Sequence, residues 1–363
     1  MSTAIVSDLH LGAIAGVDVL RRTDATERLA EALGQADRVV ILGDLLELRE
    51  RRAEEVLEAA TPALTAIGEA TAGRQLVLVP GNHDYELVAP ALERERLRGR
   101  AALPVDGRYP TDHGELSRRV AALMPATDVS LAYPGLWLRD DAFATHGHYV
   151  DLHLTVPRVE SIFAHAVDRL VGANGPSPSV DAYESAVAPV YAFSHAIAQS
   201  ARPTASIQGG NTSREVWARA SGGGAAGLAL GGVAIPAAVA ALNGLGIGHF
   251  RADISALELR RAGLRAMDRV VSDLGIGAAH VIFGHTHRAG PLPGEVEGWW
   301  LREGTRLHNT GSWILEKAFS ATEGFGNPYW PGRVTWLDDE GPPRFENVLE
   351  GLHFSSILAR FAA

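Results

Sequence analysis

The chain has no cysteine among its 363 residues. Disulfide bonds and thiolate metal sites are therefore excluded, so any metal site must use carboxylate, imidazole or amide ligands. Positive charge is also scarce, because 33 lysine and arginine residues stand against 43 acidic ones and give a formal net charge of -10. Such a chain offers no basic face for a phosphate backbone, and we expect no nucleic acid partner.

The amino terminus lacks the basic start and long apolar core of a signal peptide. Residues 1–7, Met-Ser-Thr-Ala-Ile-Val-Ser, are instead typical of a strand that begins almost at once. The default expectation is a cytoplasmic protein, with association at the inner face of a membrane as an alternative. A length of 363 residues allows one large catalytic domain with an insertion, or two domains.

Apolar runs alternate with helical patterns along the first part of the chain. Strands are predicted at 4–7, 39–42, 75–79, within 131–144, and at 280–283, and helices at 17–33, 51–70 and 86–100. Alternation at this spacing indicates βαβ units and a mainly parallel sheet, hence an α/β fold. Segments 299–301, 307–310 and 334–337 are expected to form a second, more antiparallel sheet.

Polar residues follow these apolar runs at the carboxyl ends of the predicted strands, where open α/β sheets place ligand sites. Seven of them could bind a metal: Asp8, His10, Asp44, Asn82, His146, His285 and His287. Seven ligands are too many for one ion but suit two ions that share a carboxylate. Oxygen ligands mixed with imidazole suit Mn²⁺, Fe or Zn²⁺, with Mn²⁺ the first expectation.

Two residues beside these ligands suit acid–base chemistry. A metal pair can hold a bridging hydroxide and clamp phosphoryl oxygens for in-line attack. His83 follows Asn82 directly and could protonate the leaving-group oxygen as a general acid. Asp84 could hydrogen-bond the His83 imidazole and fix its tautomer.

The ordered motifs Asp8-Leu9-His10, Gly43-Asp44, Gly81-Asn82-His83-Asp84, His146 and Gly284-His285-Thr286-His287 resemble those of the calcineurin-like metallophosphoesterases. The resemblance covers 1–150 and 279 to about 340. It implies a four-layer α/β/β/α sandwich of two mixed sheets. It also implies one ion held by Asp8, His10, Asp44 and His287, and another held by Asp44, Asn82, His146 and His285.

The segments 7–12 and 43–47 are similar to the subgroup that cleaves the pyrophosphate of UDP-2,3-diacylglucosamine. That subgroup tends to have Arg where this chain has His83, and Asp where it has His148. The difference at position 83 favours ordinary phosphoesterase chemistry with a histidine acid. His148 and Glu47 are candidate substrate-binding residues.

Residues 151–278 interrupt the α/β series with helical patterns, and we interpret them as an inserted helical cap. The catalytic domain would then comprise 1–150 and 279–363. Within the cap, the Gly/Ala-rich segment 220–250 contains no acidic residue, lysine or arginine. Pro236 divides this segment, and a single membrane crossing would separate His146 from His285. The remaining interpretations are a buried helical hairpin, a hairpin that touches a membrane interface or a lipid tail, and a flexible lid.

The sequence thus predicts a dinuclear metal-dependent phosphohydrolase acting on a phosphodiester, pyrophosphate or phosphomonoester. Two substrate classes compete, a lipid-linked nucleotide or phospholipid and a soluble nucleotide or phosphomonoester. The alternative from another class is a non-catalytic scaffold that binds metal or a partner on the same fold. Such scaffolds usually lose ligands, whereas all seven positions are filled here.

Overall fold

The computed structural model describes residues 1–14, 17–99, 102–157, 159–171, 178–200, 235–251, 253, 255–301, 304–315, 324 and 326–354. The chain divides into two compact units. The first comprises 1–147, 195–201 and 277–363, and the second comprises 148–194 and 202–276. Each unit is described below by itself, within the ranges that the structure describes.

The first unit is built on a mixed sheet of ten strands. They are β1 (Thr3–Val6), β2 (Arg38–Ile41), β3 (Gln75–Leu78), β4 (Asp106–Pro110), β5 (Asp128–Arg139), β6 (Ala142–Thr145), β7 (His280–Phe283), β8 (Arg306–Asn309), β9 (Arg333–Leu337) and β10 (Arg344–Asn347). Their order is β10-β9-β1-β2-β3-β5-β6-β7-β8, and β4 pairs with β5 outside this path. The sheet is parallel in β1-β2-β3-β5 and again in β6-β7-β8.

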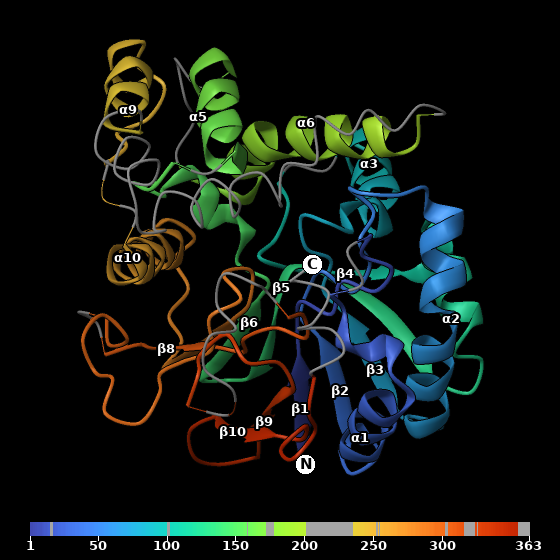
Figure 1. Cartoon of the computed structure of the whole chain (residues 1–363). Coiled ribbons are helices and arrows are strands. Elements are labelled where there is room, and N and C mark those ends of the chain that lie inside the picture. The colour runs from blue at the N-terminus through green and yellow to red at the C-terminus, as the bar shows by residue number, and fades with distance from the viewer. Residues whose placement is uncertain are drawn as a thin grey trace. The chain divides into compact units, whose positions relative to one another are not determined.

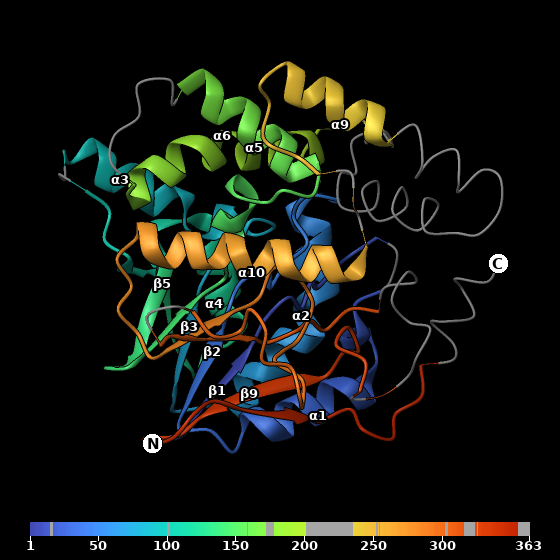
Figure 2. The same ribbon diagram turned by 90° about the vertical axis from the view of Figure 1, so that its left-hand side faces the viewer.

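The long strand β5 joins the two parallel parts. Its residues 128–131 pair with β3, and its residues 135–139 pair with β6 in antiparallel fashion. The strands therefore lie on one hydrogen-bonded path, and the predicted separation into two sheets of a four-layer sandwich is not confirmed. β8 is parallel to β7, whereas β9 is antiparallel to β1 and lies beside it (Figure 2).

The central strands have buried side chains on both faces, which explains their uninterrupted apolar runs. One core cluster spans β1, β2, β3, β5, β6 and β7, and its members include Ile5, Val40, Leu42, Val77, Val79, Leu136, Ala144 and Ile282. Each buried Val, Leu or Ile contributes about 1.5–3 kcal/mol of transfer free energy. This core fixes the strand ends, and with them the polar residues that follow.

Helices α1 (Thr23–Leu33) and α2 (Ala53–Ala70) pack together beside β1, β2 and β3 (Figure 1). Within the range 17–33 predicted as one helix, Val19–Arg21 form a short 3-10 turn and α1 begins only at Thr23. Helices α3 (Ala89–Leu97) and α4 (Glu115–Ala122) complete the helices wholly within the described part of this unit. The predicted strand at 299–301 is reduced to a single bridge between Trp300 and Arg306.

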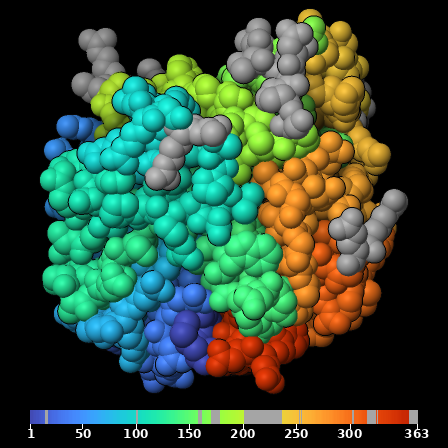
Figure 3. All heavy atoms as spheres, turned by 180° about the vertical axis from the view of Figure 1, so that it is seen from behind, coloured from blue at the N-terminus to red at the C-terminus, as the bar shows by residue number. Residues whose placement is uncertain are grey.

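The amino terminus and the β5–β6 turn both contact the turn between β9 and β10. Arg139, at the end of β5, donates hydrogen bonds to the carbonyl oxygens of Asp338 and Gly341 in the β9–β10 turn, at 2.7 and 2.8 Å. Figure 3 shows this contact as the green β5–β6 turn against the red β9–β10 segment. The terminal ammonium of Met1 pairs with Asp339 in the same turn.

The second unit is helical where it is described. It contains α5 (Val159–Val171), most of α6 (Val180–Ala198), α9 (Ile235–Gly244), α10 (Ala256–Asp273) and the 3-10 segment His148–Leu152. Of the predicted apolar segment 220–250, residues 220–234 lie outside the described residues and 235–244 form α9. Among the described helices, none combines the length and apolar character needed to cross a bilayer.

Candidate metal centre

The polar residues that follow five strands meet at one edge of the first unit's sheet. Asp8 and His10 follow β1, Asp44 follows β2, Asn82 follows β3, His146 follows β6, and His285 and His287 follow β7. All seven are buried, with at most 5% of their surface exposed. The parallel direction of these strands brings their carboxyl ends together, as the order of the motifs predicts.

One group of four side chains presents its ligand atoms within 4.8 Å of one another: Asp8, His10, Asp44 and His287. Nε2 of His10 lies 3.1 Å from Nε2 of His287, and Oδ1 of Asp8 lies 3.2 Å from the same His287 nitrogen. Two imidazole nitrogens and a carboxylate oxygen thus converge on one position. These donors suit a divalent ion.

A second group consists of Asp44, His146 and His285, whose ligand atoms also lie within 4.8 Å of one another. Oδ1 of Asn82 lies 3.1 Å from Nδ1 of His285 and 3.3 Å from Nε2 of His146. Oδ2 of Asp44 lies 3.3 Å from the same His146 nitrogen. Asp44 belongs to both groups, so its carboxylate lies between them.

The two central carboxylates each use one oxygen within the protein and leave the other without a hydrogen bond. Oδ1 of Asp44 accepts from the backbone N–H of His83 at 2.9 Å, and Oδ2 of Asp8 accepts from that of His285 at 3.1 Å. Oδ2 of Asp44 and Oδ1 of Asp8 are buried and have no hydrogen-bond partner among the described residues. A buried carboxylate oxygen without a partner is costly, and a cation at each group would satisfy it. The donor set therefore fits metal ions.

Backbone conformation also marks these residues. Five residues other than glycine have a positive φ within the described chain: Asp8 (54°), His10 (44°), Asp44 (51°), His285 (65°) and His287 (59°). Each such residue costs about 1–3 kcal/mol and persists only where the surrounding structure holds it. All five belong to the two groups, which indicates that the loops after β1, β2 and β7 are shaped to aim these side chains inward.

Glycines make room for the ligands. A Cβ on Gly43 would lie 2.0 Å from Nδ1 of His146, and a Cβ on Gly81 would lie 2.3 Å from Oδ1 of Asp44. Gly43 has a φ of 87°, whereas Gly81 has no positive φ. Gly81 is therefore required by close packing alone.

Glu47 joins the first group to His83. Its Oε2 accepts from Nδ1 of His10 and its Oε1 from Nδ1 of His83, both at 2.8 Å. With Nδ1 as the donor in each ring, Nε2 of His10 is left for a metal and Nε2 of His83 is left for a substrate. Glu47 was predicted as a substrate-binding residue, but its carboxylate is fully engaged by these two histidines.

Asp84 does not contact the His83 imidazole, contrary to the sequence prediction. Its carboxylate accepts from the backbone N–H groups of Gly81 and Leu45, both at 2.7 Å, and of Leu46 at 3.4 Å. Asp84 therefore ties the loop after β3 to the loop after β2. The predicted hydrogen bond to His83 does not form, because the carboxylate of Asp84 is used by backbone N–H groups of its own loop and of the loop after β2.

The charges in the site shift several pKa values. Burial lowers the pKa of His10, but the hydrogen bond with Glu47 and the charge of Asp44 outweigh it and raise the pKa to about 9. Burial also lowers the pKa of His146, but the charge of Asp44 outweighs burial and raises this pKa to about 10. Burial and the charge of Asp44 raise the pKa of Asp84 to about 7. In the metal-free protein, His10, His146 and Asp84 therefore hold protons more tightly than the same side chains do in water.

His83 behaves differently from these ligands. Burial lowers its pKa, and Glu47 and Asp44 only partly offset that effect. The charge of Arg49 also lowers the pKa of His83, which places a cation near this imidazole. Sequence reasoning missed Arg49, because nothing in the local pattern separates it from the neighbouring solvent-exposed arginines.

Two further residues, His148 and Asn309, lie outside the two ligand groups. His148, a predicted substrate-binding residue, belongs to the second unit and packs edge-on against Tyr149 and Tyr191. Asn309 supports the loop after β7 by donating to the carbonyl oxygen of Gly284 at 2.9 Å and to Oγ1 of Thr286 at 3.0 Å. The last residue of β8 thus supports the loop that carries His285 and His287.

A comparison with known proteins finds similarity to a family sequence model in the amino-terminal part of the chain. No curated protein sequence matches significantly. Among solved structures, the cold-active protein-tyrosine phosphatase of a psychrophilic Shewanella species is 13% identical with a TM-score of 0.28, and the comparison covers 93% of this chain and 75% of that one. A mutant cold-active protein tyrosine phosphatase is 12% identical with a TM-score of 0.31 over 93% and 75%. Scores of this size do not establish a shared fold.

The family comparison is more informative. Residues 1–173 match the sequence model described as calcineurin-like phosphoesterase, just under half of the chain. The matched range contains Asp8, His10, Asp44, Asn82 and His146, while His285 and His287 follow beyond it. The amino-terminal 173 residues are thus similar to the calcineurin-like phosphoesterases.

Proposed function

We propose that this protein is a metal-dependent phosphoesterase with a dinuclear centre. The observation that carries the proposal is the position of Asp44 within two groups of convergent donors, with one oxygen that no described group satisfies. The first ion would be held by Asp8, His10, Asp44 and His287, and the second by Asp44, Asn82, His146 and His285. The similarity of residues 1–173 to the calcineurin-like phosphoesterases supports the same chemistry.

When bound, the two ions would supply Lewis-acid stabilisation of phosphoryl oxygens and lower the pKa of a water that attacks phosphorus. The chain's own residues hold the ligand geometry. Nδ1 of His146 donates to the carbonyl oxygen of Leu42 at 2.9 Å, which leaves Nε2 with its lone pair facing Asp44. The loops with positive φ hold Asp8, His10 and His287 in place, so these side chains need little rearrangement when a substrate binds.

His83 is the proposed general acid. Glu47 accepts from Nδ1 of His83, so in the doubly protonated ring the second proton lies on Nε2 and can be given to a departing oxygen. Arg49 would add positive charge beside the leaving group. Mn²⁺ remains the first expectation for the ions, with Fe and Zn²⁺ as alternatives that the same ligands accept.

The proposed substrate is a small-molecule phosphodiester, pyrophosphate or phosphomonoester. The match to UDP-2,3-diacylglucosamine pyrophosphatases is limited to short motifs, so a lipid-linked substrate, membrane contact through 220–250 and a location at the inner membrane face stay secondary proposals. We also propose that 1–150 and 279–363 form the catalytic domain and 151–278 the cap. A panel of monoesters, diesters, nucleotide pyrophosphates and phospholipids with added Mn²⁺ would identify the bond and the substrate class. Dependence of activity on liposomes would favour the lipid class.

The decisive experiment replaces Asp44 with alanine. Asp44→Ala should abolish metal-dependent hydrolysis of an aryl phosphodiester and reduce bound metal at both positions, as measured by elemental analysis. Glu258→Ala is a control, because Glu258 is also a buried carboxylate but pairs with Arg265 in the second unit. Retained activity of Asp44→Ala in a metal-replete sample would refute the proposal.

A further inference from the structure

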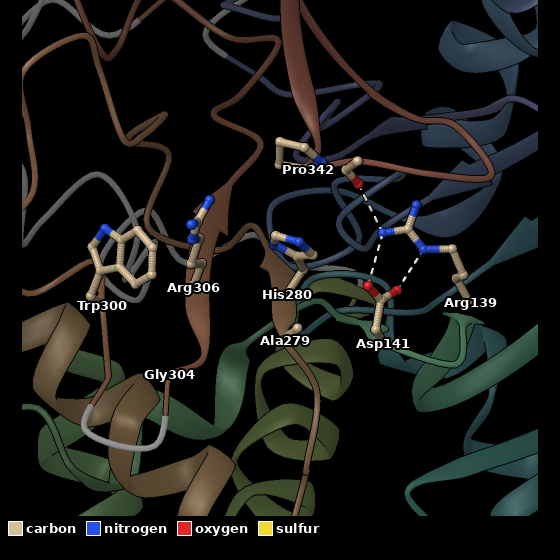
Figure 4. A pocket seen from close by; sticks show the side chains of 9 residues that line it. Arg139, Asp141, Ala279, His280, Trp300, Gly304, Arg306 and Pro342 are labelled. Atoms are coloured by element: carbon tan, nitrogen blue, oxygen red, sulfur yellow. Dashed lines mark hydrogen bonds and ion pairs between the residues drawn. The ribbon is translucent and has the colours of Figure 1, made fainter.

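A pocket lies at the end of the first unit's sheet that is opposite to the metal ligands (Figure 4). Its volume is about 280 Å³. It is lined by His280 and Arg306, the first residues of β7 and β8, whereas His285 and His287 follow the other end of β7. At a rise of about 3.3 Å per residue, His280 lies roughly 16 Å along the chain from His285. The pocket is therefore separate from the candidate metal centre.

Arg306 brings a positive charge to this pocket. Its guanidinium lies over the ring of Trp300, 3.7 Å from the centroid, and Trp300 is 48% exposed. Among the described residues, no carboxylate pairs with Arg306. Stacking on an indole orients a guanidinium without using its N–H donors, so these donors remain available to a ligand.

His280 supplies a second donor. Its Nδ1 lies 3.1 Å from Nε2 of His308, and Nδ1 of His308 is buried without a hydrogen-bond partner in the described part of the chain. A buried N–H without a partner is rarer than an acceptor without one, so the proton of His308 belongs on Nε2. His280 then accepts at Nδ1 and carries its own proton on Nε2. That N–H is the donor that His280 can offer to the pocket.

The opposite wall is close to neutral. Arg139 and Asp141 form a bidentate ion pair across the β5–β6 turn, with N···O distances of 2.5 and 3.1 Å (Figure 4). Their charges cancel, so the net charge of the pocket comes from Arg306. Burial lowers the pKa of His280, while Asp141 raises it and the charges of Arg139 and Arg306 lower it.

We propose that this pocket binds a small oxyanion, a phosphate or a carboxylate, through Arg306 and the Nε2–H of His280. The oxygens of a phosphate or a carboxylate can accept hydrogen bonds from the planar guanidinium of Arg306 and from the single N–H of His280 beside it. A divalent cation does not fit, because Asp141 is the one carboxylate among the described lining residues and it is already paired with Arg139. The proposal rests on these contacts and does not depend on the activity of the metal centre.

The experiment uses the full chain loaded with Zn²⁺, which is diamagnetic, and ¹⁵N-labelled histidine. The imidazole signal of His280, assigned by its loss in His280→Gln, is followed while inorganic phosphate or acetate is added at constant ionic strength set with chloride. Saturable shifts of the His280 signal are expected with at least one of the two anions, and comparison of the two identifies the preferred source. Shifts confined to histidines of the metal centre, or a His280 signal that does not saturate, would overturn the proposal.

Matched variants separate binding from damage to the fold. Arg306→Gln should weaken the apparent affinity by about tenfold or more, since it removes a charge-assisted contact. Arg344→Gln is the control, because Arg344 also lies over a tryptophan, Trp336 at 5.1 Å, but pairs with Asp338 outside the pocket. Asp141→Asn should strengthen binding, because it frees the charge of Arg139, and loss of structure could not produce that gain. Equal affinity in Arg306→Gln and Arg344→Gln, or weaker binding in Asp141→Asn, would contradict the proposal.

Discussion

Oε1 of Glu47 lies 2.8 Å from Nδ1 of His83, while the other oxygen of the same carboxylate lies 2.8 Å from Nδ1 of His10. A single buried side chain therefore orients a proposed metal ligand and the proposed general acid. Burial raises the pKa of Glu47, but the charges and hydrogen bonds of the two histidines outweigh it and hold the pKa well below its usual value. Glu47 is thus ionised at every pH at which the protein would work.

Replacement of Glu47 by glutamine should affect both histidines. An amide has one acceptor and one donor group, so it can serve only one of two Nδ1–H donors, and the other ring must change its tautomer. We expect a loss of about 10–100-fold in turnover or metal affinity, measured by steady-state kinetics and elemental analysis. Glu50→Gln is the control, because Glu50 accepts from the backbone of Ile14 away from both rings. Unchanged kinetics in Glu47→Gln would show that Glu47 does not position His10 and His83.

Replacement of His83 by alanine should leave the metal content unchanged and slow turnover. The loss should be greatest for substrates with poor leaving groups, because those depend most on a proton from the acid. A series of aryl and alkyl phosphoesters with graded leaving-group pKa values provides the measurement. An equal loss across the series would argue against the acid role of His83.

Metal removal should make stability depend on pH above neutrality. In the metal-free protein the pKa values of His10 and His146 are about 9 and about 10, above the unfolded value of about 6.5. A raised folded pKa contributes stability that is complete below about 6.5 and is lost as the pH rises through the folded value. We therefore expect the Tm of chelator-treated protein to fall between pH 7 and 10.

The metal-loaded protein is the control for that measurement, because bound ions replace these protons. Its Tm should change less over the same interval, and calorimetry in buffers of different ionisation enthalpy should detect protons released on metal binding near pH 7. A flat Tm for the chelated protein above pH 8 would contradict the proposed protonation. Asp84, with a pKa of about 7, adds to the fall only near pH 7, so the interval above pH 8 reports His10 and His146.

Gly81→Ala should disturb the metal centre through packing alone. Its Cβ would lie 2.3 Å from Oδ1 of Asp44 and 2.6 Å from Cδ2 of His146, both on fully buried side chains. We expect a loss of metal affinity and a lower unfolding temperature, measured by competition with a chelator and by thermal denaturation. Gly277→Ala is the matched control, because nothing lies within 4 Å of its Cβ position and its φ is not positive. Equal behaviour of the two variants would show that the loop after β3 can shift without affecting the ligands.

The sequence by itself determined which residues meet at the candidate metal centre. Short apolar runs such as 39–42 and 280–283 define buried parallel strands, and the residue that follows a parallel strand must lie at the sheet's carboxyl edge. Asp44, Asn82, His146 and His285 could therefore be placed together from local pattern and order alone. The strand β7 was even predicted with the residue range that the structure gives it.

Only the tertiary structure decided how these side chains are partnered. Glu47 and His83 are 36 residues apart, and their hydrogen bond depends on where two loops cross, which no local pattern encodes. For the same reason Asp84, adjacent to His83 in sequence, bonds backbone groups instead. The path of β5 through both parts of the sheet and the stacking of Arg306 on Trp300 are likewise products of packing, because each joins segments whose own sequences are compatible with several partners.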